Sequence, residues 1–251
     1  MAESSVLVSS KLSVSYGGVK AVSDVDLHVD RGEIVGLIGP NGAGKTSFID
    51  AVSGFAPMTG SITLNGHELR GERAHRRSRL GLSRTWQSVS LFEDLTVSEN
   101  VKVGAGHTPL ADRLRGRRQR VEIDPVLDRL GIAGLAGRLP GELSHGQRVL
   151  VGVARAIVAS PALVLMDEPG AGLDDAEGAE LGRQLRGLAA DGISVLLVDH
   201  DMNLVLDVCD RIYVLDFGRQ IAQGTPAEIA ADPAVIKAYL GTTTDEEKAE
   251  A

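Results

Sequence analysis

Long hydrophobic runs are missing from this sequence of 251 residues. The longest apolar stretches, Ala162–Met166 and Val195–Val198, are each followed closely by an aspartate. They fall far short of the roughly 20 apolar residues that a membrane-spanning helix needs. Residues 1–10 lack both a basic start and an adequate apolar segment, so we expect no signal peptide. With 43% hydrophobic and 24% charged residues, the composition is instead typical of a soluble globular protein.

Cysteine and aromatic residues are also scarce. The single cysteine, Cys209, excludes an intrachain disulfide, suits a reducing cytosol and is expected to be a small core residue. Aromatic residues make up 3% of the chain, and no Phe, Trp or Tyr interleaves with the arginine clusters at 70–79 and 113–120. These clusters are interpreted either as solvated helix faces or as a surface for anionic lipids or a partner. Together with the net charge of −8, this argues against nucleic acid as a partner.

What the sequence does contain is a phosphate-binding loop that fits the pattern G-x-x-x-x-G-K-S/T throughout. Its residues are Gly39, Pro40, Asn41, Gly42, Ala43, Gly44, Lys45 and Thr46. Glycines let successive backbone N–H groups point at phosphate oxygens, and a following helix directs the positive end of its dipole at them. Lys45 is expected to reach the β- and γ-phosphates, and the Thr46 hydroxyl to bind Mg²⁺.

The surroundings of the loop have the required pattern. Glu33–Ile38 is predicted to be a buried strand, and Ser47–Ser53 the helix that follows, with Ser47 counted among the nucleotide-binding residues. The sequence therefore predicts a protein that binds a nucleoside triphosphate.

A second apolar strand, predicted over Leu163–Asp167, ends in two adjacent carboxylates. On its own, such a pair is often a solvated strand end. In a chain with a phosphate-binding loop, Asp167 is expected to hold Mg²⁺ directly or through water, and Glu168 to act as the general base on the attacking water.

The segment Leu143–Gln147 precedes an amphipathic stretch, Arg148–Ala159. Ser144 has the character of a helix N-cap, and the small Gly146 would allow an anion to approach the helix end. An ordinary capped helix is the alternative.

The pattern along the chain predicts an α/β fold. Alternation in Lys11–Tyr16 and Asp24–Asp30 indicates an antiparallel β part, and Gly, Arg and Leu at helical spacing over about 88–143 indicate an inserted helical subdomain. Strands and helices then alternate to the end, which favours a mainly parallel sheet in a phosphate-loop ATPase core.

The motifs taken together resemble the ATPase subunits of ABC transporters. The segments that carry the resemblance are Gly39–Thr46, Gln87, Leu143–Gln147, Leu163–Glu168, Gly172–Asp174 and His200. The resemblance covers about residues 7–241 and implies ATP and Mg²⁺ as ligands, with two subunits that sandwich two ATP molecules head to tail. It also implies a single domain over 1–241, with a core of about 1–87 and 150–225, a helical subdomain of about 88–149, a helical extension of about 226–241, and a disordered tail at 242–251.

By the same resemblance, Ser144, Gly146 and Gln147 contact the ATP of the other subunit, and Asp174 lies in a loop that communicates between the two sites. Gln87 is implied as a sensor of Mg²⁺ and the partner, His200 as a contact to the γ-phosphate and water, and Tyr16 as the aromatic that stacks on adenine. Each has an alternative: Tyr16 as a core residue, His200 in a surface turn, Gln87 packing beside Trp86. His145 departs from the glycine that is commonest at its position.

Further segments, among them Tyr16–Val22, Arg84–Gln87 and Val235–Gly241, resemble the ATPases of branched-chain amino-acid importers. Urea and short-amide importers and lipopolysaccharide exporters share much of this pattern. The implied partners are membrane-spanning permease subunits, a second ATPase subunit in a homo- or heterodimer and, indirectly, a substrate-binding protein. The implied location is the cytoplasmic face of the membrane.

Two other classes of function remain as alternatives. A soluble ABC ATPase acting on nucleic acid or ribosomes is disfavoured by the single cassette, the lack of sustained heptads and the acidic charge. A phosphate-loop kinase or GTPase would leave Leu143–Gln147 unexplained.

Overall fold

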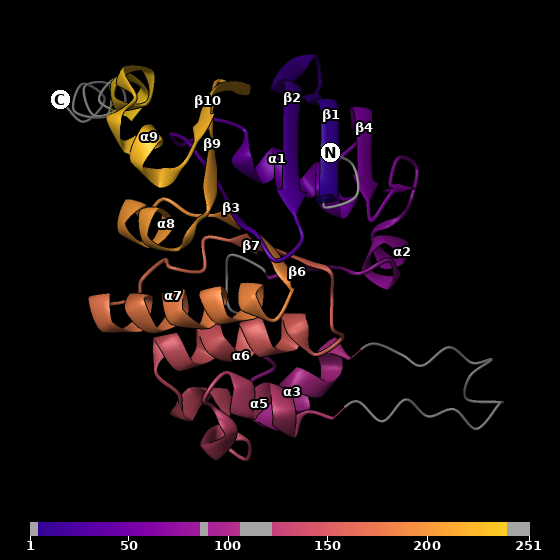
Figure 1. Ribbon diagram of the computed structural model, residues 1–251. Helices are drawn as coiled ribbons and strands as arrows, with labels where there is room; N and C mark the ends of the chain where they lie inside the picture. Colours follow the sequence, from indigo (N-terminus) through magenta and orange to yellow (C-terminus); the bar gives the residue numbers. More distant parts are fainter. Residues whose placement is uncertain (1–4, 86–89, 106–121, 240–251) are drawn as a thin grey trace.

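The computed structural model describes residues 5–85, 90–105 and 122–239. Gln87, the arginine cluster at 113–120 and the acidic tail lie outside these residues. Figure 1 shows strands in the middle and upper part of the molecule and a layer of helices below them. No helix among the described residues is long and apolar enough to cross a membrane.

The first part of the chain forms the antiparallel sheet that its alternating pattern predicts, in the strand order β2-β1-β4-β5. Its strands are β1 (Ser5–Tyr16), β2 (Val19–Asp30), β4 (Thr59–Leu64) and β5 (His67–Glu68). The first two strands are longer than expected, because Lys11 and Asp24 adopt positive φ angles of 47° and 51° where the register shifts. Such bulges let a strand continue although its alternation is interrupted.

The second sheet has the order β10-β9-β3-β8-β7-β6, and all neighbours in it are parallel except β9 and β10. Its strands are β3 (Ile34–Ile38), β6 (Leu82–Arg84), β7 (Leu163–Asp167), β8 (Ser194–Val198), β9 (Arg211–Asp216) and β10 (Arg219–Gly224). Every residue of β3, β7 and β8 is buried, as expected for parallel strands covered on both faces. The prediction of an α/β fold with a mainly parallel sheet and an antiparallel N-terminal part is confirmed.

Helices connect and cover these strands. They are α1 (Lys45–Ser53), α2 (Ala74–Arg79), α3 (Val97–Gly104), α5 (Asp124–Arg129), α6 (His145–Ile157), α7 (Asp175–Ala190), α8 (Met202–Val208) and α9 (Pro226–Ala231). Short 3-10 turns occur at Ala133–Leu135 and Pro140–Glu142, and residues 233–239 are also helical. Helix α6 packs against α3, α5 and α7, and it runs across position 149, where we expect the helical subdomain to end.

The parallel sheet separates two hydrophobic clusters. Alternate residues such as Val35 and Leu37 face the antiparallel sheet and α1, whereas Ile34 and Ile38 face the helices α3, α5, α6 and α7. Burying one such side chain contributes about 1.5–3 kcal/mol. The sheet is therefore held on both faces, and the loops at the carboxyl ends of its strands have a rigid support.

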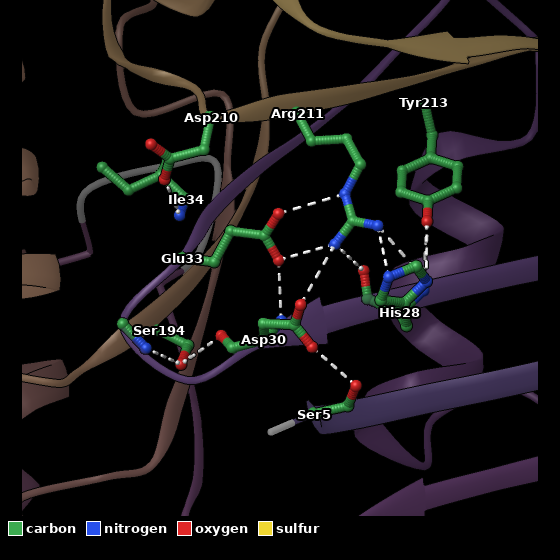
Figure 2. Close-up of polar contacts among 10 residues, drawn as sticks. Ser5, His28, Asp30, Glu33, Ile34, Ser194, Asp210, Arg211 and Tyr213 are labelled. Atoms are coloured by element: carbon green, nitrogen blue, oxygen red, sulfur yellow. Dashed lines mark hydrogen bonds and ion pairs between the residues drawn. The ribbon is translucent and has the colours of Figure 1, made fainter. Parts of the chain in front are cut away.

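A polar cluster joins the two sheets at the start of β3, the end opposite to the phosphate-binding loop (Figure 2). Arg211 of β9 donates to both carboxylate oxygens of Glu33, at 3.0 and 2.7 Å, and also contacts the His28 ring of β2. That ring in turn bonds the hydroxyl of buried Tyr213 at 3.1 Å. The cluster fixes the antiparallel sheet on the parallel one, and we assign it a structural role.

Candidate nucleotide-binding and catalytic site

The phosphate-binding loop runs from β3 to α1, and its glycines are required by its backbone. Gly39 has a φ of 148°, and a Cβ atom there would lie 2.0 Å from the carbonyl oxygen of Leu215. Gly44 has a φ of 101°, and a Cβ atom there would lie 2.3 Å from the carbonyl oxygen of Ala21. A side chain at either position would collide with backbone, so the loop lies closely against β2 and β9.

Lys45 is the first residue of α1, and its ammonium group folds back over the loop. Its Nζ donates to the carbonyl oxygens of Gly39 at 2.6 Å and Pro40 at 3.0 Å. Burial lowers the pKa of Lys45, while the negative charges of Glu168 and Asp167 act in the opposite direction. The arrangement places a buried cation where phosphate oxygens can replace the carbonyl groups as its partners.

A cavity of about 190 Å³ opens above the loop. Asn41 through Ser47 line it together with Ala21 and Glu168. The structure therefore brings the loop and the second carboxylate of the β7 end to one hollow, as the sequence predicts.

Glu168 follows β7 in a left-handed conformation, with a φ of 49° that is uncommon for a residue with a side chain. Its backbone N–H donates to the carbonyl oxygen of Val198 on the neighbouring β8, at 2.7 Å. The next loop places His200 beside it, with 3.8 Å between His200 Nδ1 and Glu168 Oε2. Strain of this kind costs about 1–3 kcal/mol and clusters at functional sites.

Asp199 is a site residue that we did not predict from the sequence. Its side chain is fully buried, and it accepts backbone N–H groups from Gly170 at 2.8 Å, His200 at 2.8 Å and Asp201 at 3.0 Å. Burial raises the pKa of Asp199, and the three hydrogen bonds oppose that shift. Asp199 thus ties the loop after Glu168 to the loop that carries His200.

Arg84 is a second site residue for which the sequence predicts no role. It lies at the end of β6 and donates to Asp167 Oδ2 at 3.0 Å and to Asp50 Oδ1 of α1 at 2.6 Å. Burial raises the pKa of Asp167, against the opposing effect of Arg84. The arginine links the β7 carboxylate to the helix that follows the phosphate-binding loop.

The oxygen donors of Thr46 and Asp167 are of the type that Mg²⁺ prefers, together with water and substrate phosphates. Among residues 5–85, 90–105 and 122–239 no three or more His, Cys, Asp or Glu side chains gather into a metal site. These few protein donors fit a metal ion that is held jointly with the phosphates.

The segment Leu143–Gln147 lies apart from the phosphate cavity. Ser144 caps α6 by accepting from the N–H of Gln147 at 3.2 Å, and Gln147 Oε1 accepts from the Ser144 N–H at 3.0 Å. Ser144, Gly146 and Gln147 line another cavity, of about 240 Å³, beside the start of α7. Asp174 caps α7 by accepting from the N–H of Glu177 at 2.8 Å.

The remaining candidates lie at loops and edges. Tyr16 ends β1 and is 47% exposed, and the His200 side chain is 60% exposed. The C-terminal segment also reaches the site: burial raises the pKa of Tyr239, and an interaction with the backbone of Gly39 opposes that shift. This long-range contact has no signal in the local sequence pattern.

Comparison with known proteins agrees with this geometry. Residues 22–171 match the family model of the ABC transporter, and residues 219–244 match that of the branched-chain amino acid ATP-binding cassette transporter. The chain belongs to the ABC transporter family of ATP-binding cassettes. Its membership confirms the expectation of an ATPase that couples ATP hydrolysis to transport.

Individual ATP-binding proteins of named transport systems are also similar to this chain. The chain is 37% identical over 250 residues to the high-affinity branched-chain amino acid transport ATP-binding protein BraF of Pseudomonas aeruginosa, covering 94% of this chain and 98% of that protein. It is 38% identical over 244 residues to the corresponding LivG of Escherichia coli, covering 92% and 95%. The lipopolysaccharide export ATP-binding protein LptB of Haemophilus influenzae is 36% identical over 238 residues, covering 94% and 98%. The resemblance to the branched-chain amino-acid subfamily is confirmed.

Solved structures agree in fold. The ADP conformation of MJ1267, an ATP-binding cassette of an ABC transporter, superposes with a TM-score of 0.84 at 28% identity, covering 94% of this chain and 99% of that chain. The cbiO1 protein of Clostridium perfringens, part of the transporter complex cbiONQ, gives a TM-score of 0.80 at 29% identity, covering 94% of each chain.

Proposed function

We propose that this chain is the ATP-hydrolysing subunit of a membrane importer for branched-chain amino acids. The observation that carries the proposal is that the phosphate-binding loop and Glu168 together line one cavity. A loop that binds phosphates and a carboxylate that can accept a proton are the two parts that hydrolysis of a nucleoside triphosphate needs.

In the proposed reaction, the backbone N–H groups of Gly39 and Asn41–Gly44 and the Lys45 ammonium bind the phosphates of ATP. Glu168 accepts the proton of the attacking water, and His200, held by Asp199, contacts the γ-phosphate and that water. Mg²⁺ would neutralise charge on the β- and γ-phosphates, with Thr46, Asp167 and Gln87 as the protein groups that hold it. Tyr16 would stack on adenine.

The separation of the two cavities within one chain supports a dimer of ATPase subunits. Ser144, Gly146 and Gln147 line a cavity separate from the phosphate cavity, so a single chain presents two half-sites. In the proposed dimer, whose second ATPase subunit is a like or an unlike chain, this segment completes the other subunit's ATP site. Asp174 communicates between the two.

ATP binding and ATP-dependent dimerisation are tested with the Glu168→Gln chain. This substitution removes the proposed general base and leaves the phosphate-binding loop intact. We expect the variant to be a monomer alone and a dimer with ATP in a sedimentation experiment. A monomer that binds ATP would contradict self-pairing and indicate an unlike ATPase subunit. A chain that binds no ATP would overturn the proposal.

A third cavity, of about 430 Å³, is the candidate docking surface for a permease subunit. Phe92, Val103 and Val149 line its apolar part, and Phe92 is 51% exposed. We propose that a cytoplasmic helix of the membrane-spanning partner inserts here, so that the chain is peripheral on the inner face of the membrane. The division into a core of about 1–87 and 150–225, a helical subdomain of about 88–149 and an extension of about 226–241 belongs to this proposal.

The docking proposal predicts separate effects on transport and hydrolysis. Phe92→Asp should abolish co-purification with the permease and transport, while ATP hydrolysis by the isolated chain is unchanged. Phe55→Asp is the matched control, since Phe55 is 59% exposed but does not line this cavity. Equal transport by the two variants would contradict the docking site.

The match of residues 219–244 to the branched-chain amino acid cassette supports this cargo over the alternatives. Urea or short-amide import and lipopolysaccharide export remain as alternatives, and the likeness to LptB gives the last of these some support. Uptake of labelled leucine by cells with and without the chain distinguishes them, and uptake unchanged by deletion would contradict the proposed cargo.

A further inference from the structure

The side chain of Glu177 on α7 lies at the N-terminal end of α6, where the proposed mechanism places a phosphate of the partner's ATP. Its Oε1 atom accepts the hydroxyl of Ser144 at 2.9 Å and the backbone N–H of Gly146 at 3.0 Å. These are two donors of the segment expected to contact the partner's ATP. A carboxylate oxygen with two donors at a helix N-terminus is bound in the way an anionic ligand would be.

Close packing makes the contact specific. A Cβ atom at Gly146 would lie 2.7 Å from Glu177 Cδ, so a side chain at position 146 would push the carboxylate away. The Ser144 hydroxyl also accepts from the Gln147 N–H, and its hydrogen is therefore committed to Glu177. The neighbouring His145 ring bonds the carbonyl oxygen of Ala171 at 3.0 Å and ties the same helix end to the loop before α7.

The start of α7 offers Glu177 a second position. Helices α3, α6 and α9 each have a capping box, in which Glu or Gln at the third helical position accepts the N–H of the capping residue. In α7 the cap is Asp174 and the third residue is Glu177, but its side chain extends to α6 instead. A rotation of this side chain toward the Asp174 N–H would complete the box in α7.

We infer that Glu177 is an internal latch, which holds the phosphate-contacting end of α6 until the γ-phosphate of the partner's ATP displaces it. The inference rests on the proposed function, because that function supplies the incoming phosphate. Displacement would move the carboxylate toward Asp174, so arrival of ATP at one site changes the loop that faces the other. Two latches open per dimer, and both oppose closure in the absence of ATP.

The latch is tested first on the chain without nucleotide, with inorganic sulfate as the probe and the Gly146 amide resonance as the readout. Glu177→Gln keeps the side-chain shape and removes the charge, and Glu177→Ala empties the position. We expect sulfate to bind at least about fivefold more tightly to both variants than to the unchanged chain, because a charged acceptor competes more strongly than a neutral or absent one.

Glu180→Gln is the matched control. Glu180 lies on the same helix and lines the same cavity, but it bonds Arg183 and Gln184 rather than α6. Equal sulfate binding by the Glu177 variants and this control would overturn the latch. The tighter binding would then come from the loss of any negative charge near the cavity. Weaker binding by the Glu177 variants would overturn it also.

A second measurement uses the Glu168→Gln background and ATP. Adding Glu177→Gln should lower the ATP concentration for half-maximal dimerisation by at least about fivefold. The affinity of the single chain for ATP should not change, because Glu177 does not line the phosphate cavity. An unchanged or higher concentration would contradict the latch. If the parent chain binds ATP without pairing, self-pairing fails, and the sulfate titration decides the latch alone.

Discussion

At the scale of single residues, the buried carboxylate of Asp199 is a group whose pKa the fold raises. It receives three backbone N–H groups and has no exposed surface. Its hydrogen bonds reach Gly170 in one loop and His200 in the other. The position of His200 beside Glu168 therefore depends on a residue that itself does not line the phosphate cavity.

The raised pKa of Asp199 predicts a pH-dependent contribution to stability. Because the folded chain binds this proton more tightly than the unfolded chain, the contribution falls as pH rises from the ordinary aspartate range through the raised pKa. Asp199→Asn lacks this ionisation. The free energy of unfolding of the unchanged chain minus that of the variant should therefore decrease over this window, as measured by urea denaturation at several pH values.

Asp128→Asn is the control for that comparison, since Asp128 is exposed on α5. The difference for Asp199→Asn should fall more steeply with pH than the difference for this control. A flat difference for Asp199→Asn would contradict the assignment of a raised pKa to Asp199.

At the scale of elements, the helix after the phosphate-binding loop is held at its far end by Arg77 of α2. The buried guanidinium donates to the carbonyl oxygens of Ala51 and Val52, at 2.6 and 2.7 Å, and to that of Glu72 at 2.9 Å. The last carbonyl groups of a helix have no partner within it, so this arginine supplies what α1 lacks.

Replacing Arg77 with Met should lower the free energy of unfolding by about 3 kcal/mol, since it leaves buried carbonyl groups without a charged donor. Arg79→Met on the same helix is the control, because Arg79 is exposed and its loss should cost less than about 0.5 kcal/mol. Thermal and urea unfolding measure both. Equal losses in the two variants would contradict the role of Arg77 as a cap.

Elements of this kind differ in how far the sequence predicts them. Strands β3, β7 and β8 were predictable because each is a continuous apolar run beside a motif, and the phosphate-binding loop because its spacing is local. The contacts of Arg84, Asp199 and Glu177 were not, because they join segments that only the folded sheet brings together. A pattern within one segment carries no information on such partners.

At the scale of the whole molecule, the parallel sheet collects loops from separate parts of the chain at one edge. The loop after β3, the carboxylate after β7 and the histidine after β8 meet there, as the ligand sites of open α/β sheets do. The polar cluster around Arg211 lies at the opposite end and holds the two sheets together (Figure 2). The candidate catalytic residues thus lie at one end of these strands, and the contacts that join the two sheets lie at the other.

The central claim is that the phosphate-binding loop and Glu168 form a hydrolytic centre. The most direct test measures ATP binding and ATP hydrolysis side by side in the unchanged chain, Glu168→Gln and the exposed control Glu93→Gln. We predict that Glu168→Gln binds ATP as the unchanged chain does and hydrolyses it at least about 100-fold more slowly, as expected for loss of a general base. Hydrolysis by Glu168→Gln at the rate of the control would contradict the account.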